Sequence, residues 1–583
     1  MLHHAAISPQ PPRLHVVARH AVALACTLIA SCAVAQTPTL RSTTIAHRVT
    51  AGDTLEHLAQ RYLGDATLWP ALQSHNRVHN PYRLQPGSVL EIPMQLLRAA
   101  TASVDYVQGT AHLSRSGVAG PAPITRGMPL QEGDQLQLDP NAFVAVRLAD
   151  GSTVRVQANS QLALSQLRRR GRSGSLQSVL DVQQGGIAVQ VPGKPDAQRR
   201  LDVITPVAAT SVRGTEFDVQ LLADGRTTAA VLKGTVAVQS LADARNTAPT
   251  AVLRPRTGIG VSADGQAGAV TALLPAVPPS ALPTLNEDAQ WLNLPLPVWN
   301  NAHGWRVAIS EDAQGQQVLR NGQFEGTQAR FAAIADGSYF LQVRAVDAQG
   351  ISGLPTTAPL RVKAHPVPPL AQTPAPGAVL AQGEAQLQCT PVQGVQSYRH
   401  QVIALPALDA AAPPAAFSPA LLEHSSNTTC ALDLSRLPAG YYAWRAASVR
   451  MVQGQEDMGP FAPAHAFRIA PKPATPSLDD LQVQTQAGMS TIYWPGEAGQ
   501  RFRLQALASP DSSAPALDTV LDTPQWTASG LPAGTWHVRI QVQDPSGLHS
   551  AFSPPRSVQV RALVHDGFGH PVSSGTGLGI EHP

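Results

Sequence analysis

The pattern of hydrophobic positions changes its period along this chain, and the first part is helical. From Leu55 to Tyr62, apolar residues recur at the i, i+3, i+4 and i+7 spacing of an amphipathic helix. Asp53 is placed to cap this helix, with a glutamate three residues later to complete a capping box. A second short helix is expected from about residue 68 to 75. Alternating apolar residues flank both helices, so residues 47–93 are expected to fold as β-α-α-β.

Between about residues 100 and 240 the period falls to two, which is the period of half-buried strands. Turn residues such as Asp150-Gly151 separate the short alternating runs. The expected strands include Phe143–Leu148, Thr153–Val156, Leu162–Leu164, Ile187–Val191, Glu216–Val219 and Lys233–Val238. Many short strands with glycine-containing turns indicate an all-β domain, either a sandwich or a solenoid-like sheet.

The second half of the chain contains a repeat. An aromatic residue followed by arginine recurs at Trp305-Arg306, Tyr398-Arg399 and Phe502-Arg503. Glycine, any residue and an aromatic residue recur from Gly337, Gly440 and Gly534. Successive copies are about 100 residues apart, the size of one immunoglobulin-like sandwich. Three sandwiches are therefore expected, over residues 286–365, 366–472 and 473–563.

Two further segments complete the expected organisation. Residues 241–285 are rich in Ala, Pro, Gly and Thr, so part of this segment is expected to be a linker. Residues 564–583 are expected to be a flexible tail. The fold class expected for the whole chain is multi-domain and mainly β.

Composition narrows the classes of function. With 43% hydrophobic and 14% charged residues, the chain can form packed cores. The formal net charge of +3 over 583 residues is too small to indicate nucleic-acid binding. The one basic run, at residues 168–172, contains no aromatic residue and is expected to be a solvated loop. No nucleic acid is expected as a partner.

The N-terminus has the pattern of an export signal. The apolar run from Ala21 to Ala35 follows two arginines and is short for a membrane span. Ala33-Val34-Ala35 offers a cleavage site, so residues 1–35 are expected to be a signal peptide. An alternative stays open, because Ile29-Ala30-Ser31-Cys32 resembles a lipobox. In that case the signal ends before Cys32, which carries a lipid anchor. Both alternatives predict an exported protein of the periplasm or cell envelope, and the second allows an outer-membrane lipoprotein.

Outside this signal the sequence contains two cysteines, Cys389 and Cys430. An even pair in an oxidising compartment predicts a disulfide. No further ligands cluster near either cysteine in the sequence, so no metal site and no cofactor are expected.

Residues 47–93, with the sequence HRVTAGDTLEHLAQRYLGDATLWPALQSHNRVHNPYRLQPGSVLEIP, resemble the lysin motif (LysM). This module holds N-acetylglucosamine-containing glycans such as peptidoglycan. The resemblance implies a groove between the loop before the first helix and the loop after the second. The contacts it implies are Gly52, Asp53, Thr54 and Leu55 in the first loop and Asn76, Asn80 and Pro81 in or near the second. Purely structural roles stay open: Asp53 as a helix cap, Leu55 as a core residue and Pro81 as a turn residue.

Residues 100–240 resemble the FecR-type domain of periplasmic regulators. The matching segments are Asp150-Gly151-Ser152, Gln184-Gly185-Gly186 and the stretch from Thr205 to Phe217. The resemblance implies an envelope protein as a partner. In such regulators a cytoplasmic anti-sigma segment and a membrane span precede this domain. Here a signal sequence and the lysin motif take that position, which argues against direct control of a sigma factor.

The three repeats resemble fibronectin type III domains. Trp299 and Trp494 stand at the place of the strand-B tryptophan of that family, and Cys389 takes this place in the second repeat. The resemblance implies that Cys389 exchanges the packing of a tryptophan for a bond to Cys430. This requires both cysteines to face the same core.

Motifs of catalysis are absent from the sequence. It contains no G-x-S-x-G, H-E-x-x-H, P-loop or C-x-x-C pattern. A glycan hydrolase needs two positioned carboxylates, whereas most of the sparse acidic residues lie in turns. We therefore expect a non-catalytic cell-envelope protein that is anchored to peptidoglycan and presents its β-domains to protein or glycan partners. The alternatives are a FecR-type sensing component and a cell-wall hydrolase or its accessory protein.

Overall fold

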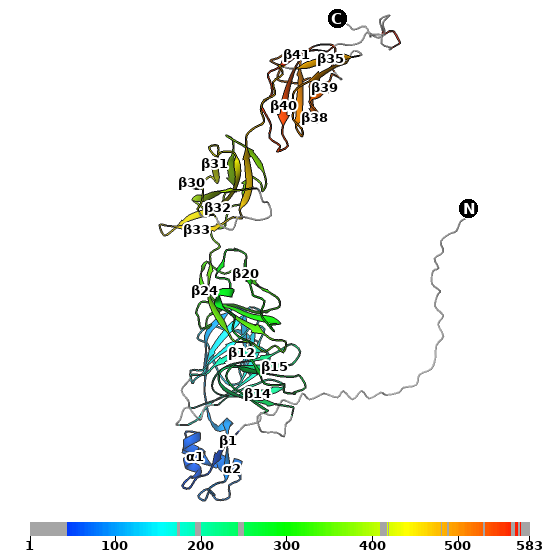
Figure 1. The fold of residues 1–583 in the computed structure, drawn as a ribbon. Helices are drawn as coiled ribbons and strands as arrows, with labels where there is room; N and C mark the ends of the chain where they lie inside the picture. Colours follow the sequence, from blue (N-terminus) through cyan, green and yellow to red (C-terminus); the bar gives the residue numbers. More distant parts are fainter. Residues whose placement is uncertain are drawn as a thin grey trace, which may run out of the picture. The chain divides into compact units, whose positions relative to one another are not determined.

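The computed structural model describes residues 44–171, 175–192, 200–242, 250–407, 417, 419–479, 481–486, 489–528, 531–560, 566–568 and 572. The expected signal sequence, including Cys32, and most of the expected tail lie outside these residues. The chain divides into two compact units. The first is residues 1–98 with 170–174, and the second is residues 99–169 with 175–583. The fold class is mainly β, with one small helical module near the N-terminus (Figure 1).

The N-terminal module has the expected β-α-α-β order. Its elements are β1 Thr44–Arg48, α1 Leu55–Tyr62, the 3-10 turn η1 Ala66–Leu68, α2 Trp69–Asn76, β2 Val89–Pro93 and the 3-10 turn η2 Met94–Leu96. The two strands pair antiparallel, with Ile45 opposite Ile92. The four apolar residues of α1 identified by their helical spacing are all buried. Among the helices in the described part of the chain, none has the length and apolar character needed to cross a membrane.

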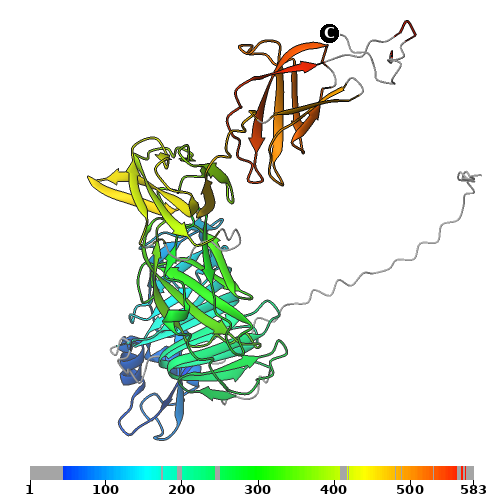
Figure 2. The ribbon, with the colours of Figure 1, turned by 45° about the horizontal axis from the view of Figure 1, so that its top comes forward.

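The next domain is a single large twisted sheet (Figure 2). Its strands are β3 Arg98–Ala99, β4 Ala102–Gln108, β5 Ala111–Ser114, β6 Ala122–Pro123, β7 Pro129–Leu130, β8 Gln135–Leu138, β9 Phe143–Arg147, β10 Thr153–Val156, β11 Gln161–Arg169, β12 Leu176–Gln190, β13 Arg200–Ile204, β14 Ala208–Leu221, β15 Thr227–Ser240, β16 Ala251–Leu253, β17 Thr257–Val261 and β18 Thr271–Ala272. The long strand β12 pairs with β11 along its first part and with β10 along its last part. The same strand pairs with β13 and then β14 on its other side.

The change of partner along β12 depends on its glycine pair. Gly185 has a φ of +70°, which favours glycine, and a Cβ there would collide with Ser160. The hydroxyl of Ser160 accepts a hydrogen bond of 2.9 Å from the Gly186 amide. At Gln184-Gly185-Gly186, β12 therefore ends its pairing with β11, and its pairing with β10 begins directly afterwards.

The expectation of a linker over residues 241–285 is wrong for its central part. Strands β16 and β17 pair antiparallel with β15, and β18 pairs with β17. Leu253, Ile259 and Val261 are fully buried in the core of the large sheet. A short strand needs an apolar residue at only every second position, so the intervening glycines and alanines concealed these strands in the composition.

Three further domains each contain two sheets. The first repeat contains the 3-10 turn η3 Pro279–Ala281 and the strands β19 Leu285–Asn286, β20 Trp291–Pro295, β21 Gly304–Ser310, β22 Val318–Phe324, β23 Gln328–Ala332, β24 Gly337–Val346 and β25 Thr356–Val362. The second contains β26 Ala371–Thr373, β27 Val379–Ala381, β28 Gln386–Cys389, β29 Ser397–Leu405, β30 Leu422–Ser426, β31 Ala431–Asp433, β32 Gly440–Val452, β33 Gln455–Phe461 and β34 His465–Ala470. The third contains β35 Gln482–Gln486, β36 Met489–Tyr493, β37 Arg501–Leu507, β38 Leu517–Leu521, β39 Gln525–Thr527, β40 Gly534–Gln543 and β41 Arg556–Val560. In each repeat, a sheet of two or three strands accompanies a sheet of four to six.

The sequence repeat marks the same contacts in all three domains. The aromatic residues before the repeated arginines, Trp305, Tyr398 and Phe502, are buried in the three cores. The aromatic residue two positions after each repeated glycine donates a hydrogen bond to the carbonyl of the residue four positions before the aromatic residue. These bonds are Tyr339 Oη to Ala335 at 3.0 Å, Tyr442 Oη to Pro438 at 2.8 Å and Trp536 Nε1 to Pro532 at 2.9 Å. A corner contact of this kind fixes the turn that leads into a central strand of a sandwich.

Within the second unit, the large sheet and the first repeat are in contact. Arg344 on β24 forms an ion pair of 2.8 Å with Asp218 on β14, and Asp218 is almost fully buried. Nearby, Val318 packs with Phe143 and Ala145 of β9.

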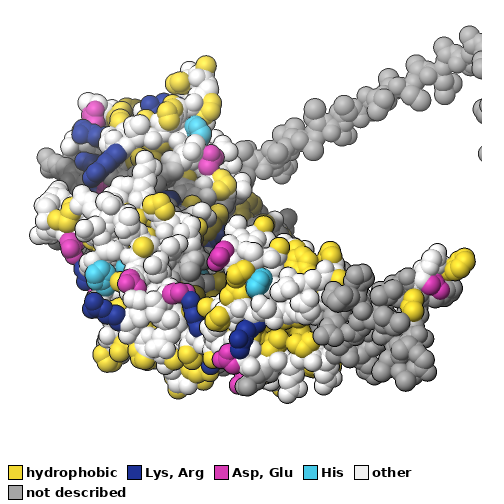
Figure 3. Space-filling model, turned by 90° about the horizontal axis from the view of Figure 1, so that it is seen from above, with side chains coloured by type: hydrophobic (Ala, Val, Ile, Leu, Met, Phe, Trp, Pro, Cys, Tyr) yellow, Lys and Arg dark blue, Asp and Glu magenta, His cyan; other side chains and the backbone are white. Residues whose placement is uncertain are grey.

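On the face seen in Figure 3, acidic and basic side chains are interspersed with hydrophobic ones.

Candidate functional site

The loop between β1 and α1 is a closed turn built around one carboxylate. Asp53 Oδ2 accepts hydrogen bonds from the amide of Thr50 at 2.7 Å and from its hydroxyl at 2.8 Å. The Asp53 amide in turn donates to the Thr50 carbonyl at 3.1 Å. Gly52 is exposed in this turn and has a φ of +91°, which favours glycine. The turn therefore has a fixed backbone with its glycine facing solvent.

A buried histidine ties this turn to the helix. His47 on β1 has its Nε2 2.9 Å from Asp53 Oδ2 and its Nδ1 2.9 Å from Tyr62 Oη. His47 is 8% exposed, so its contact with Tyr62 is buried and its contact with Asp53 is partly buried. Strand β1, the loop and the end of α1 are thus joined through one side chain.

The same contacts set the charge of Asp53. Burial raises the pKa of this carboxyl, but the hydrogen bonds from Thr50 and His47 outweigh it and lower the pKa from 3.8 to about 2. Asp53 is therefore ionised at neutral pH, with its charge directed into the loop.

The expected helix cap was displaced by one residue. Thr54, not Asp53, is the N-cap of α1, because its hydroxyl accepts a hydrogen bond of 3.1 Å from the His57 amide. Both residue types cap helices well. Asp53 is already engaged by Thr50 and His47, so the cap falls to the next residue.

The second loop begins with an asparagine that holds strand β2. Asn76 Nδ2 donates to the carbonyls of Leu72 at 2.9 Å and Glu91 at 2.8 Å, and Asn76 Oδ1 accepts from the Glu91 amide at 2.7 Å. Both amide hydrogens are thereby used within the module. Asn76 has a structural role that accounts for its side chain without a ligand.

The remaining predicted residues differ in exposure. Asn80 is exposed and closes a small turn by accepting a hydrogen bond of 3.0 Å from the Tyr82 amide. Pro81 is half-buried. Leu55 is 1% exposed, so its side chain belongs to the core. This agrees with the structural role that the sequence left open for Leu55.

The two loops meet at their ends. The Val49 amide donates to the Ser88 carbonyl, and the Gly87 amide donates to the Val49 carbonyl, both at 2.8 Å. The structure thus joins the loop containing Gly52, Asp53 and Thr54 to the loop that ends at Gly87 and Ser88.

The sequence reasoning missed an aromatic residue in the second loop. Tyr82 is 80% exposed, which is unusual for a large aromatic side chain. Its place next to Asn80 and Pro81 was the available signal. An exposed ring in a loop can offer a flat apolar face to a sugar.

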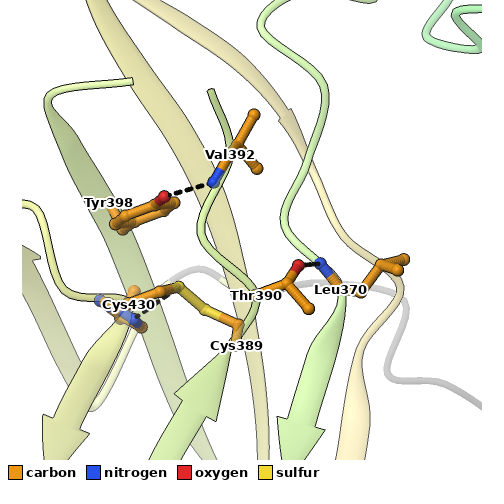
Figure 4. Close-up of a disulfide and its surroundings, with 7 residues drawn as sticks. Leu370, Cys389, Thr390, Val392, Tyr398 and Cys430 are labelled. Atoms are coloured by element: carbon orange, nitrogen blue, oxygen red, sulfur yellow. Dashed lines mark hydrogen bonds between the residues drawn. A yellow bond between two sulfur atoms is a disulfide. The ribbon is translucent and has the colours of Figure 1, made fainter. Parts of the chain in front are cut away.

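A second constellation lies in the second repeat, and it includes the predicted disulfide. Cys389 and Cys430 are bonded, both are 6% exposed, and both belong to the same core. Figure 4 shows the pair near Tyr398, whose hydroxyl accepts a hydrogen bond of 2.8 Å from the Val392 amide. The predicted disulfide, and the expectation that both cysteines face one core, are confirmed.

The fold brings a potential metal ligand close to these cysteines, although none clusters beside them in the sequence. His400 on β29 is fully buried, and its Nε2 lies 3.9 Å from Cys430 Sγ. Burial, assisted by the neighbouring His424, lowers the pKa of His400 to about 4. The ring is therefore neutral at pH 7. Sequence spacing did not reveal this neighbour because it comes from the opposite sheet.

Comparison with known proteins identifies two domains. Residues 47–93 match the LysM domain family, and residues 134–237 match the FecR protein family. No curated protein matches the chain by sequence.

Solved structures give weaker similarities. The FN1–FN3 domains of chicken CNTN1 align over 48% of this chain and 96% of that chain, at 14% identity and a TM-score of 0.24. A proposed anti-sigma factor from Parabacteroides distasonis aligns over 24% of this chain and 59% of that chain, at 20% identity and a TM-score of 0.19. The alignment therefore spans less than two thirds of that second protein.

Proposed function

We propose that residues 47–93 bind peptidoglycan or another N-acetylglucosamine-containing glycan and anchor a non-catalytic protein in the cell envelope. The match of these residues to the LysM domain family carries the proposal. The two joined loops support it, because the first has a closed turn with an exposed glycine and the second an exposed aromatic ring.

A neutral glycan is held by hydrogen bonds to its hydroxyl and acetamido groups and by apolar contact with its ring faces. The turn at residues 50–54 has a fixed backbone, so little conformational entropy is lost when a sugar binds there. Asp53 and Asn76 act by holding the loops in place. Gly52, Asn80 and Tyr82 are exposed and are the residues that we place against the sugar.

Co-sedimentation with purified peptidoglycan tests this assignment on the full chain. We expect Tyr82→Ala to weaken binding about tenfold, the typical loss when an aromatic contact residue is truncated. Val89→Ala is the matched control. Val89 is 59% exposed in the same module and alternates with the buried Leu90 on β2, so it points away from the helices.

Two outcomes distinguish glycan binding by residues 47–93 from the specific role of Tyr82. If the wild-type chain does not sediment with peptidoglycan, the anchoring proposal fails. If it sediments and Tyr82→Ala binds as tightly as Val89→Ala, the anchor stands and the role given to Tyr82 is wrong.

A second candidate function is envelope sensing, and the FecR match over residues 134–237 favours it. In this proposal the β-domains present a surface to an envelope protein partner. Chemical crosslinking of the exported chain in cells, followed by mass spectrometry, identifies that partner. Crosslinks confined to peptidoglycan-associated material, with none to residues 134–237, would remove this candidate.

The proposed location is the periplasm or cell envelope, with a lipid anchor at Cys32 as the open alternative. Mass spectrometry of the mature N-terminus distinguishes the two forms. Cleavage after Ala35 leaves Gln36 first, whereas a lipoprotein begins with a modified Cys32.

The absence of catalytic activity is part of the proposal and has its own test. A glycan hydrolase needs a pair of carboxylates at a defined separation. A zymogram of the purified chain on peptidoglycan should remain without a lytic band. A clear band would establish the hydrolase alternative instead.

A further inference from the structure

The second repeat differs from its neighbours at two buried positions. Counting from the repeated aromatic-arginine pair, the first and third repeats have Val307 and Leu504 in the core, where the second has His400. Cys389 takes the place that Trp299 and Trp494 have in the other two repeats. One domain has therefore exchanged apolar core residues for a sulfur and an imidazole in contact range.

Backbone pairing holds the two cysteines together independently of their covalent bond. Strands β28 and β31 are antiparallel, with Gln388 opposite Ala431. The Cys389 amide donates to the Cys430 carbonyl at 2.9 Å, and the two Cα atoms are 5.2 Å apart. Both side chains enter the same core, so two thiols produced by reduction would remain neighbours.

The imidazole approaches from the other sheet. His400 Nε2 lies 3.9 Å from Cys430 Sγ, and the ligand atoms of Cys389, His400 and Cys430 all lie within 4.8 Å of one another. Sulfur and nitrogen ligands in a tetrahedral zinc site are about 3.6 Å apart, so small side-chain shifts are sufficient. In the part of the chain that the structure describes, this is the only group of three His, Cys, Asp or Glu side chains that could share one ion.

We propose that reduction of the Cys389–Cys430 bond converts this core into a binding site for a thiophilic divalent cation such as Zn²⁺, with His400 as the third ligand. Thiolate and imidazole are the ligands that zinc prefers. Three protein ligands leave the fourth tetrahedral position open to water or a small anion. The two states exclude each other, because the same sulfurs form either the disulfide or the metal bonds.

A dithiol is the reductant that we propose for the Cys389–Cys430 bond. A thiolate of the dithiol attacks one sulfur and forms a mixed disulfide, and its second thiol then releases the protein. The protein ends with two thiols and the reductant with a disulfide. Binding of the cation then releases the two thiol protons.

Both cysteines are 6% exposed, and the small pocket that Cys389 lines with Pro369 and Trp444 has no room for a water molecule. We therefore expect the reductant and the cation to reach the sulfurs through local opening of this repeat.

The test uses the purified full chain in a phosphine reductant, which converts the disulfide and water into two thiols and a phosphine oxide. Co²⁺ serves as the spectroscopic probe and Zn²⁺ as its competitor. We expect one equivalent of Co²⁺ per chain with a thiolate-to-cobalt charge-transfer band, displaced by Zn²⁺. The same chain without reductant should show no such band. The double variant Cys389→Ser/Cys430→Ser measures any contribution from the other cysteines.

The variant His400→Leu tests the third ligand. Leucine is the residue at the matching position of the third repeat, so this change is compatible with the core. Loss of a residue that hydrogen-bonds to a metal ligand weakens metal sites by about 10–100-fold, so loss of a direct ligand should weaken binding by more than about 100-fold. His424→Leu, an exposed histidine on the neighbouring strand, is the matched control and should bind as the wild type does.

Three outcomes would overturn the proposal. The reduced wild-type chain could bind no Co²⁺ beyond the double cysteine variant. The His400→Leu variant could bind as tightly as His424→Leu. The reduced chain could also lose the near-UV circular dichroism of its folded state and fail to regain it with Zn²⁺. Recovery of that signal on adding Zn²⁺ would support the site, because binding would then be coupled to folding.

Discussion

Asp53 is the residue on which the first loop depends, and its ionisation makes the module sensitive to acid. Its pKa is lowered to about 2 in the folded chain, against 3.8 for the free residue. A lowered pKa contributes stability that is present above pH 4 and is lost as the pH falls through the window from 4 to about 2. Hydrogen exchange of residues 44–93, corrected for the intrinsic rate, should show protection falling across this window.

The variant Asp53→Asn isolates this effect from the other carboxyl groups. We expect the module to be less protected at pH 7 and to show a smaller further loss between pH 4 and 2. Equal pH dependence in the variant and the wild type would show that Asp53 does not control the acid response.

At the scale of single residues, sequence reasoning identified the loops but not every role within them. The buried face of α1 followed from helical spacing alone. The choice between Asp53 and Thr54 as helix cap did not, because it depends on His47 across the loop. His400 was missed for the same kind of reason, since Cys389 lies at the end of β28 and Cys430 just before β31, two strands of the other sheet.

Among the structural elements, the corner contact of the repeats can be tested in the second repeat. Tyr442 is 4% exposed and donates a hydrogen bond of 2.8 Å to the Pro438 carbonyl. Tyr442→Phe keeps the ring and removes the donor, so we expect a loss of about 1 kcal/mol in the free energy of unfolding of this repeat. Urea denaturation followed by hydrogen exchange of residues 440–452 measures the loss.

The neighbouring tyrosine provides the control for this prediction. The Cζ atom of Arg468 lies 5.6 Å from the centroid of the Tyr441 ring. Tyr441→Phe keeps the ring and therefore retains this contact. A loss in Tyr441→Phe equal to that in Tyr442→Phe would mean that the corner hydrogen bond contributes no specific stability.

The sequence predicted elements well where the periodic segments were long and less well where they were short. The repeated Gly-x-aromatic signal located a central strand of each repeat, at β24, β32 and β40. The strands β16 and β17 were read as linker because residues 241–285 are rich in Ala, Pro, Gly and Thr. Their assignment depends on pairing with β15, and local sequence does not contain that information.

For the whole molecule, the interface between the large sheet and the first repeat determines how these two domains unfold. Arg344 and Asp218 form an ion pair of 2.8 Å, with side-chain exposures of 16% and 2%. Breaking a buried ion pair typically costs about 3–5 kcal/mol, and the low end applies here because Arg306 and Arg155 also interact with Asp218. We expect Arg344→Ala to lower the stability of the contact by about 3 kcal/mol. The first repeat and the large sheet should then unfold in two transitions in calorimetry.

An exposed ion pair gives the matched control. Arg501 and Asp522 in the third repeat are also 2.8 Å apart, but their side chains are 56% and 81% exposed. Arg501→Ala should therefore change stability by less than about 1 kcal/mol. If Arg344→Ala has an equally small effect and the wild-type transition is preserved, the large sheet and the first repeat are not coupled through Asp218. Their joint unfolding would then depend on apolar contacts such as those of Val318 with Phe143 and Ala145.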